Sequence, residues 1–195
     1  MRTVSLLRHG KTEANERFLY CGVSDLPLTA AGAEELRILR DTHRYPAKDG
    51  LTFFTSGLRR TEETLRILYG EVPHTASSDL REMDFGEFEL QSYDVLRDTD
   101  SYQRWLTGDN CQNRCPGGES GQEMAARVLS AFRALPEQGD LLLVLHGGPI
   151  AAILAALFPA EPKNRYDWQP RNGQGYRILM DRSQAVSYEV IPSLS

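Results

Sequence analysis

The sequence has few cysteines, and its start does not look like a secretion signal. Its three cysteines, Cys21, Cys111 and Cys115, cannot all pair, and Ser5 and Arg8 interrupt the apolar stretch that a signal peptide would need. We therefore expect free thiols in the reducing cytoplasm. Because Cys111 and Cys115 have no second Cys or His pair nearby, a zinc site is not expected, and the sequence implies no bound metal.

The chain also lacks a long hydrophobic run and an excess of positive charge. Its longest uncharged apolar stretch, residues 150–158, is far shorter than the ~20 residues that a membrane-spanning helix needs. The net charge of −5 at pH 7 would repel nucleic acid and anionic membrane surfaces. We expect neither partner, and an anionic ligand would have to bind at a local cationic site.

What the sequence does contain is the composition of an ordinary globular protein. Of its 195 residues, 41% are hydrophobic and 25% are charged, which excludes a collagen and a largely disordered chain. At about 150 residues per domain, the length predicts a single domain over residues 1–195. The Gly-x4-Gly-Lys-Ser/Thr phosphate loop is absent, which disfavours nucleotide hydrolysis of that class.

Strand-like and helix-like segments alternate along the sequence. Residues 141–145 are five apolar residues in a row, as in a strand buried on both faces. Thr29 suits a helix N-cap, and Ser120 with Glu123 fits a capping box. Strands are predicted at 4–7, 51–55, 73–77, 141–145, 176–180 and 185–190, and helices at 28–40, 58–69, 93–106 and after residues 120 and 147. The alternation predicts an α/β fold, a three-layer α/β/α sandwich with a mainly parallel central sheet.

Charged or titratable residues come at the carboxyl edge of this sheet, where ligands of such folds bind. Arg8 and His9 end the first strand, Arg60 opens the helix after the second, Glu82 follows the third, and His146 ends the central strand. Taken one at a time, each has an ordinary structural explanation. Their joint placement at one edge favours a functional site.

These residue types suit phosphoryl transfer. Arginine forks match phosphate oxygens, and backbone N–H groups at a glycine-rich helix start, here Gly147 and Gly148, also attract anions. A neutral imidazole is a nucleophile, a protonated second histidine would stabilise the transferring group, and a carboxylic acid can protonate a leaving alkoxide. Because positioning and positive charge do most of the work in such a transfer, the set needs neither a metal nor a cofactor.

Residues 8–15, RHGKTEAN, resemble the R-H-G-x-T-x-x-N motif of the histidine phosphatase superfamily, the phosphoglycerate mutase-like proteins. Five further segments have counterparts in that family, in the same order: residues 25–29, 56–64, 80–89, 116–120 and 144–150. The resemblance implies a phosphoglycerate mutase-like fold. It also identifies Arg60, rather than Arg59, as the arginine that matches the one in the corresponding family segment.

The resemblance further implies a role for each site residue. His9 would be the nucleophile that becomes phosphohistidine, and Glu82 would be the general acid and base. Arg8, Arg60 and His146 would clamp the transferring group. The expected phosphate-binding residues are Arg8, Asn15, Arg60, His146 and Gly147.

Three functions remain open at this point. A phosphatase gives the phosphoryl group to water, a cofactor-dependent mutase returns it to another hydroxyl of its substrate, and a binding module would hold phosphate without turnover. Glu82 and His146 are 64 positions apart, without the extra segment usual in family mutases, and this favours hydrolysis of a small phosphorylated metabolite. Residues 87–105 resemble those of α-ribazole phosphatases, so α-ribazole 5′-phosphate and sugar phosphates are candidate substrates.

The surroundings of the site are expected to shape the pocket. The loop with Tyr20 and Cys21 and residues 107–120 are predicted to border it. Tyr93, Tyr102 and Trp105 would form either a lid or one packed helix face, which makes residues 93–120 a candidate lid. His43 and His74 are expected at the surface, and no oligomeric state is predicted. Three positions depart from the family pattern without removing a site residue: Gly57, Leu90 and Ala151.

Overall fold

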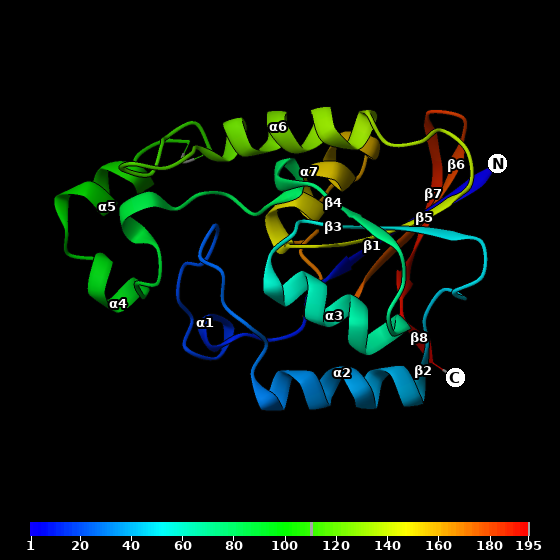
Figure 1. The fold of residues 1–195 in the computed structure, drawn as a ribbon. Helices are drawn as coiled ribbons and strands as arrows, with labels where there is room; N and C mark the ends of the chain where they lie inside the picture. The colour runs from blue at the N-terminus through cyan, green and yellow to red at the C-terminus, as the bar shows by residue number, and fades with distance from the viewer. Residues whose placement is uncertain (110, 195) are drawn as a thin grey trace.

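The computed structural model describes residues 1–109 and 111–194, and a six-stranded sheet runs through their centre (Figure 1). Its order is β4-β3-β5-β1-β6-β7. The four strands β4 (His74–Ala76), β3 (Leu51–Thr55), β5 (Asp140–Leu145) and β1 (Arg2–Arg8) are parallel, and the hairpin of β6 (Gly175–Asp181) and β7 (Gln184–Ile191) extends the sheet in antiparallel fashion. The prediction of a mainly parallel central sheet is confirmed.

Helices cover both faces of the sheet (Figure 1). The helices α6 (Gly121–Arg133) and α7 (Gly147–Leu157) lie over one face, and α2 (Ala30–Thr42) and α3 (Arg59–Tyr69) lie over the other. Each pair packs on its own buried apolar cluster, one containing Val128 and Ile150 and the other Leu36 and Leu65. The three-layer α/β/α arrangement follows from these two clusters, because both faces of the sheet are apolar.

The strand register brings the functional segments together. Every residue of β5 from Leu141 to Leu145 is fully buried, as its unbroken apolar sequence predicts. In the parallel ladders, Arg8 is opposite Leu145 and Thr55 is opposite Val144. The carboxyl ends of β1, β3 and β5 therefore meet at one edge, and the segments that follow them start side by side.

The predicted helix over residues 93–106 is wrong in one respect, because the segment forms two short helices. These are α4 (Tyr93–Leu96) and α5 (Asp100–Leu106), and they lie beyond the edge of the sheet (Figure 1). The break comes at Thr99, whose hydroxyl accepts a hydrogen bond from the backbone of Tyr102 and so caps a new helix. A threonine in a periodic apolar pattern can act in this way, since its side chain competes for backbone N–H groups.

Several short elements complete the chain. The segment between β4 and α4 holds two 3₁₀ turns, η1 (Ser78–Leu80) and η2 (Gly86–Phe88). One short helix and one small strand pair were not predicted: α1 (Glu13–Glu16), and β2 (His43–Arg44) paired with β8 (Ser193–Leu194). Their sequences carry too few residues for a periodic pattern to develop.

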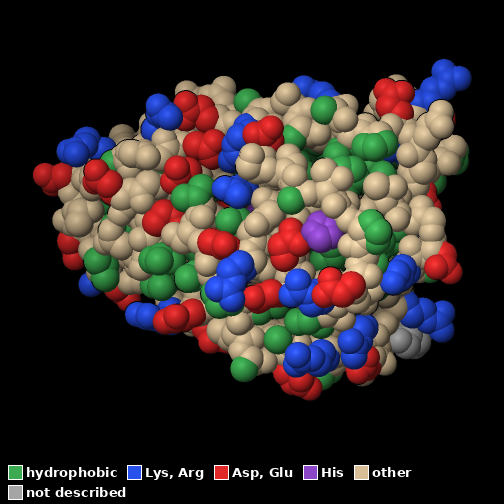
Figure 2. All heavy atoms as spheres, in the orientation of Figure 1, with side chains coloured by type: hydrophobic (Ala, Val, Ile, Leu, Met, Phe, Trp, Pro, Cys, Tyr) green, Lys and Arg blue, Asp and Glu red, His purple; other side chains and the backbone are tan. Residues whose placement is uncertain are grey.

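The outside of the molecule carries no broad area of one charge in the view of Figure 2, where basic and acidic side chains are interspersed. Within the described ranges, no helix has the length and apolar character to cross a bilayer.

The capping box at the start of α6 gives a test of the local sequence–structure relation. Ser120 Oγ accepts a hydrogen bond from Glu123 N at 3.1 Å, and Glu123 Oε2 accepts one from Ser120 N at 2.9 Å. We expect Ser120→Ala to lower the free energy of unfolding by about 1 kcal/mol, measured by urea denaturation. Ser130→Ala, at an exposed position inside the same helix, is the control and should cost nothing. Equal effects of the two substitutions would contradict the capping role.

Candidate active site

Two histidine rings touch at the carboxyl edge of the sheet. His9 follows β1 and His146 follows β5, and their ring centroids are 5.1 Å apart at an interplanar angle of 62°. Both are buried, with 6% and 1% of their surface exposed. His9 Nδ1 lies 2.6 Å from the carbonyl oxygen of Gly10, which can only accept a hydrogen bond. Nδ1 therefore carries the proton, and Nε2 of neutral His9 keeps a free lone pair.

The tautomer of His146 is fixed from two sides. Arg60 Nε, which can only donate, lies 3.3 Å from His146 Nδ1, so Nδ1 accepts. Nε2 then carries the proton and donates it to Ser56 Oγ at 2.8 Å. Ser56 and Arg60 both follow β3, so the segment after this neighbouring strand orients the ring.

The environment of the two rings keeps them neutral. Burial lowers the pKa of His9 well below its ordinary value, and the positive charges of Arg60 and Arg8 lower it further. Burial also lowers the pKa of His146 well below its ordinary value, with Arg60 the next largest cause. At neutral pH His146 is therefore uncharged, contrary to the expectation of a protonated second histidine. The main reason is burial, and the same arginines which would attract phosphate add to it because they repel a proton.

The guanidinium group of Arg60 is buried, with only 1% of the residue exposed. Its Nη1 donates to the carbonyl oxygen of Ser24 at 2.7 Å and its Nη2 to that of Gly22 at 2.6 Å. Its neighbour Arg59 instead faces outward and pairs with Glu63 at 3.4 Å. The structure thus separates the two arginines into one inside the site and one at the surface, as the family alignment predicts.

Arg8 supplies a second positive charge. Its Nη1 donates to the carbonyl oxygen of Pro170 at 2.9 Å, and its Nε is buried without a hydrogen-bond partner among the described residues. Burial lowers the pKa of both Arg8 and Arg60. In the part of the chain that the structure describes, neither of them forms an ion pair with a carboxylate. A buried cation and a half-buried cation without an ion-paired carboxylate make a site that favours a multiply charged anion.

The carboxylate of Glu82 faces these cations and lies against the start of α7. Its Oε2 accepts a hydrogen bond from Gly148 N at 2.9 Å, and its Oε1 accepts one from Met83 N at 3.0 Å. A side chain at position 148 would put its Cβ 2.2 Å from Glu82 Oε1. The glycine is therefore required for the acid to approach the helix, and not only for the turn.

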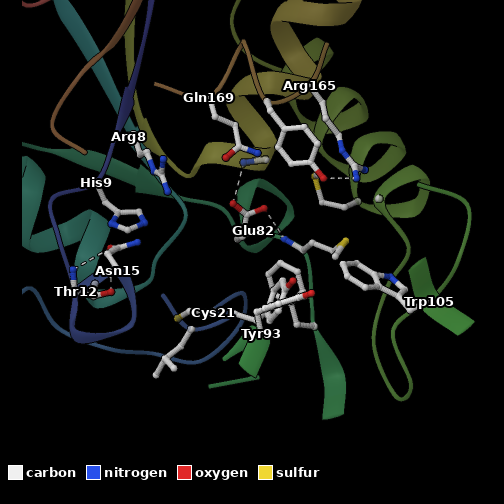
Figure 3. A pocket seen from close by; sticks show the side chains of 18 of the residues that line it. Arg8, His9, Thr12, Asn15, Cys21, Glu82, Tyr93, Trp105, Arg165 and Gln169 are labelled. Carbon is white, nitrogen blue, oxygen red and sulfur yellow. Dashed lines mark hydrogen bonds between the residues drawn. The ribbon is translucent and has the colours of Figure 1, made fainter. Parts of the chain in front are cut away.

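A cavity of about 500 Å³ joins these groups (Figure 3). Five of the predicted site residues line it: Arg8, His9, Asn15, Arg60 and Glu82. His146 lies behind the wall, against His9 and Arg60. Gly147 does not line the cavity either, whereas its neighbour Gly148 does. A Cβ at Gly147 would lie 3.3 Å from Arg8 Cζ, so this glycine makes room for the arginine, and its contact with phosphate stays a prediction.

Asn15 is oriented by its own helix. Its Oδ1 accepts hydrogen bonds from Thr12 N at 3.0 Å and Thr12 Oγ1 at 3.1 Å, as part of a capping box at the start of α1. Because the amide oxygen is occupied in this way, the NH₂ group is the end left for the cavity (Figure 3).

The rest of the cavity wall is largely aromatic. Tyr102 and Trp105 are buried and also line the cavity, so they belong to the core and to the wall at once, while Tyr93 is more than half exposed at its rim. Tyr20 and Cys21 border the cavity as predicted. The described residues between 107 and 120 do not, because the wall passes from Leu106 directly to the start of α6. That part of the prediction is wrong.

The lining residues that the sequence did not point to include one whole segment. Arg165, Tyr166 and Gln169 come from the connection between α7 and β6, and Figure 3 shows Gln169 near Arg8 and Arg165 farther from His9. The segment carries no periodic pattern, and the family matches end before it, so nothing in the sequence marked these residues. No group of three or more His, Cys, Asp or Glu side chains within the described ranges is arranged to hold a metal ion.

With this geometry in place, comparison with known proteins becomes informative. The model of the histidine phosphatase superfamily (branch 1) matches residues 4–190. The chain belongs to this superfamily. The match extends past the motifs recognised in the sequence and includes the C-terminal hairpin.

The relatives carry two kinds of name. A protein of Enterobacter sp. (strain 638), provisionally named phosphoglycerate mutase GpmB, is 34% identical over 85% of this chain and 80% of its own. The adenosylcobalamin/alpha-ribazole phosphatase of Salmonella typhimurium is 32% identical over 86% of this chain and 85% of its own. The crystal structure of an Escherichia coli protein, provisionally described as an alpha-ribazole-5′-P phosphatase, superimposes with a TM-score of 0.85 at 26% identity, covering 98% of this chain and 96% of its own. Similarity therefore supports phosphatase-type phosphoryl transfer.

The lowered pKa values of His9 and His146 predict how the free energy of unfolding depends on pH. Since their pKa values are lower in the folded chain than in the unfolded chain, the unfolded chain binds more protons below about pH 6.5. Their contribution is fully present above that pH and is lost as the pH falls, by up to about 1.4 kcal/mol per pH unit for each ring.

Urea unfolding between about pH 5 and pH 7.5 measures this slope. His146→Gln should reduce it, because this substitution removes one of the two buried rings whose pKa is lowered. A slope that His146→Gln does not alter would contradict the assignment of His146 as neutral.

Proposed function

We propose that this chain is a metal-independent phosphomonoesterase that works through a phosphohistidine on His9. The observation that carries the proposal is the contact of two buried, neutral imidazoles beside the buried guanidinium group of Arg60 and the half-buried one of Arg8, neither of which forms an ion pair within the described residues. An uncharged ring is a nucleophile, and the surrounding charge is what a phosphoryl group needs during transfer.

In the first half-reaction, His9 Nε2 attacks the phosphorus atom of the ester. A bond forms between nitrogen and phosphorus while the bond to the alcohol oxygen breaks. Glu82, in its protonated form, gives its proton to that oxygen, so the alcohol leaves neutral. Arg8, Arg60 and the NH₂ group of Asn15 hold the phosphoryl oxygens in the meantime, and Gly10 holds the imidazole proton at Nδ1.

In the second half-reaction, Glu82 is a carboxylate and accepts a proton from a water molecule. The water oxygen bonds to phosphorus, the bond to His9 breaks, and inorganic phosphate is released. Atoms and protons balance, because Glu82 ends protonated as it began. The backbone N–H groups of Met83 and Gly148 hold its carboxylate in place through both steps.

The cavity favours an ester with a large, flat alcohol. Its wall carries Tyr20, Phe85, Tyr102 and Trp105, and aromatic faces of this kind stack on planar rings. We propose α-ribazole 5′-phosphate, whose benzimidazole is such a ring, as the first substrate to test, in keeping with the name of the Salmonella relative. A sugar phosphate is the second. A mutase would need both to exclude water and to grip the carboxylate of a small sugar acid, and a cavity of about 500 Å³ is large for such a substrate.

Trapping the intermediate tests the mechanism. Rapid acid-free quenching after mixing with labelled ester should leave label on the protein that is stable to base and lost in acid, as expected of a phosphorus–nitrogen bond. His9→Ala should leave no label and lower turnover by at least about a thousandfold, with its far-ultraviolet circular dichroism retained. Label on serine or aspartate would refute the histidine mechanism.

Product analysis separates hydrolysis from mutase activity. With 3-phosphoglycerate and its bisphosphate, a hydrolase releases inorganic phosphate, whereas a mutase forms the 2-isomer faster than it releases inorganic phosphate. Absence of nitrophenol from p-nitrophenyl phosphate together with phosphate binding would point instead to a non-catalytic module.

The leaving group tests Glu82. We expect Glu82→Gln to slow hydrolysis of an alkyl phosphate by about a hundredfold or more, because the alkoxide needs a proton, and to affect p-nitrophenyl phosphate much less. Glu87→Gln, an exposed glutamate nearby, is the matched control and should change neither rate. Equal losses on both esters in Glu82→Gln would remove Glu82 as the acid.

A further inference from the structure

Glu89 has an unusual set of partners for a glutamate close to an active site. Its Oε1 accepts hydrogen bonds from Gly22 N at 2.8 Å, Val23 N at 3.2 Å and Phe85 N at 3.1 Å. Its Oε2 accepts them from Ser24 N at 3.2 Å and Ser24 Oγ at 2.5 Å. All five donors are neutral, and four of them belong to one loop, residues 22–24. The carboxylate therefore holds a stretch of backbone and not another charge.

The opposite side of the same loop holds Arg60. The carbonyl oxygens of Gly22 and Ser24 accept the hydrogen bonds of Arg60 Nη2 and Nη1. Within residues 22–24, amide N–H groups point to the anion of Glu89, while carbonyl oxygens point to the cation of Arg60. The peptide dipoles therefore lie between two opposite charges and are aligned by both. Burial lowers the pKa of Arg60, and the negative charge of Glu89 is among the influences that oppose this.

The loop has little freedom to take another path. A Cβ at Gly22 would lie 1.6 Å from the carbonyl oxygen of Met83 and 2.7 Å from Glu89 Oε1. Just before the loop, Tyr20 exchanges two backbone hydrogen bonds with the residues after Glu89, accepting from Leu90 N at 2.7 Å and donating to Gln91 O at 3.0 Å. Glu89 and its neighbours thus clamp residues 20–24, and the clamp determines where the acceptors for Arg60 are.

We propose that Glu89 is a positioning residue that acts through loop 22–24 to hold the guanidinium of Arg60 where it grips the phosphoryl group. The inference rests on the proposed function, since it takes Arg60 to be a phosphate ligand. Glu89 does not line the cavity and does not touch the substrate. Its effect on phosphate affinity is entirely relayed by Arg60.

The test compares Glu89→Gln alone and in an Arg60→Ala background. Glutamine keeps the shape but removes the charge and replaces one acceptor oxygen with an NH₂ group that faces N–H donors. We expect the Kd for inorganic phosphate, measured by calorimetry, and the KM for p-nitrophenyl phosphate to rise at least about tenfold in Glu89→Gln. In the Arg60→Ala background the same substitution should change them less than about twofold, because coupled residues are not additive.

Two controls separate this role from a general loss of structure. Glu87→Gln removes an exposed carboxylate two positions away, which accepts none of these five hydrogen bonds, and should leave both constants unchanged. Ser24→Ala removes one of the five donors and serves if Glu89→Gln does not fold. It should give a smaller rise that also disappears in the Arg60→Ala background.

The outcomes distinguish this inference from the proposed function. Phosphate binding without hydrolysis by the unmodified protein would overturn the proposed phosphatase activity. The phosphate Kd values of the single and double variants would still decide the role of Glu89. A loss that persists at full size in the Arg60→Ala background, or no loss in either variant, would overturn the positioning role while leaving the phosphatase intact. No phosphate binding by the unmodified protein would overturn both.

Discussion

The buried guanidinium group of Arg60 and the half-buried one of Arg8 form no ion pair within the described residues, and backbone carbonyl groups around them compensate for their charge. A buried charge without hydrogen bonds costs several kcal/mol, so carbonyl oxygens of Gly22, Ser24 and Pro170 are directed at Arg60 and Arg8. Burial is the main reason that His9 and His146 stay neutral, and the same two positive charges lower their pKa values further. The arginines therefore favour both a neutral ring and a nearby anion.

The fold provides this arrangement through the alignment of its strand ends. β1, β3 and β5 finish level with one another, and each is followed directly by a group of the site, His9, Ser56 and His146. The apolar clusters on both faces keep the strands in register. The positions of the polar side chains at the edge of the sheet are therefore fixed by the packing of the apolar core. The aromatic part of the cavity wall is built differently, from the short helix α5 beyond the sheet and from the loops that carry Tyr20 and Phe85.

Much of this could be predicted from the sequence, for reasons that differ between elements. The strand at 141–145 and the caps at Thr29 and Ser120 are encoded locally, by an apolar run and by hydroxyl side chains, and they are found as predicted. The interruption at Thr99 and the place of Gly147 depend on tertiary packing, which local patterns do not carry. Residues 165–169 were missed because a connection without periodicity reveals its neighbours only after folding. Leu90 is one of the positions that depart from the family pattern. Its φ is 58°, an angle that glycine adopts more readily than leucine, so the departure has a cost in backbone conformation.

The distribution of the two tryptophans has a practical consequence. Trp105 forms part of the cavity wall beside Tyr20, whereas Trp168 is enclosed by Phe158, Tyr176 and Tyr188 under the C-terminal hairpin. One indole is thus an emitter whose surroundings change when the cavity fills, and the other is an internal reference whose surroundings stay the same. Removing Trp168 would leave an intrinsic fluorescence signal that reports occupancy without any added dye.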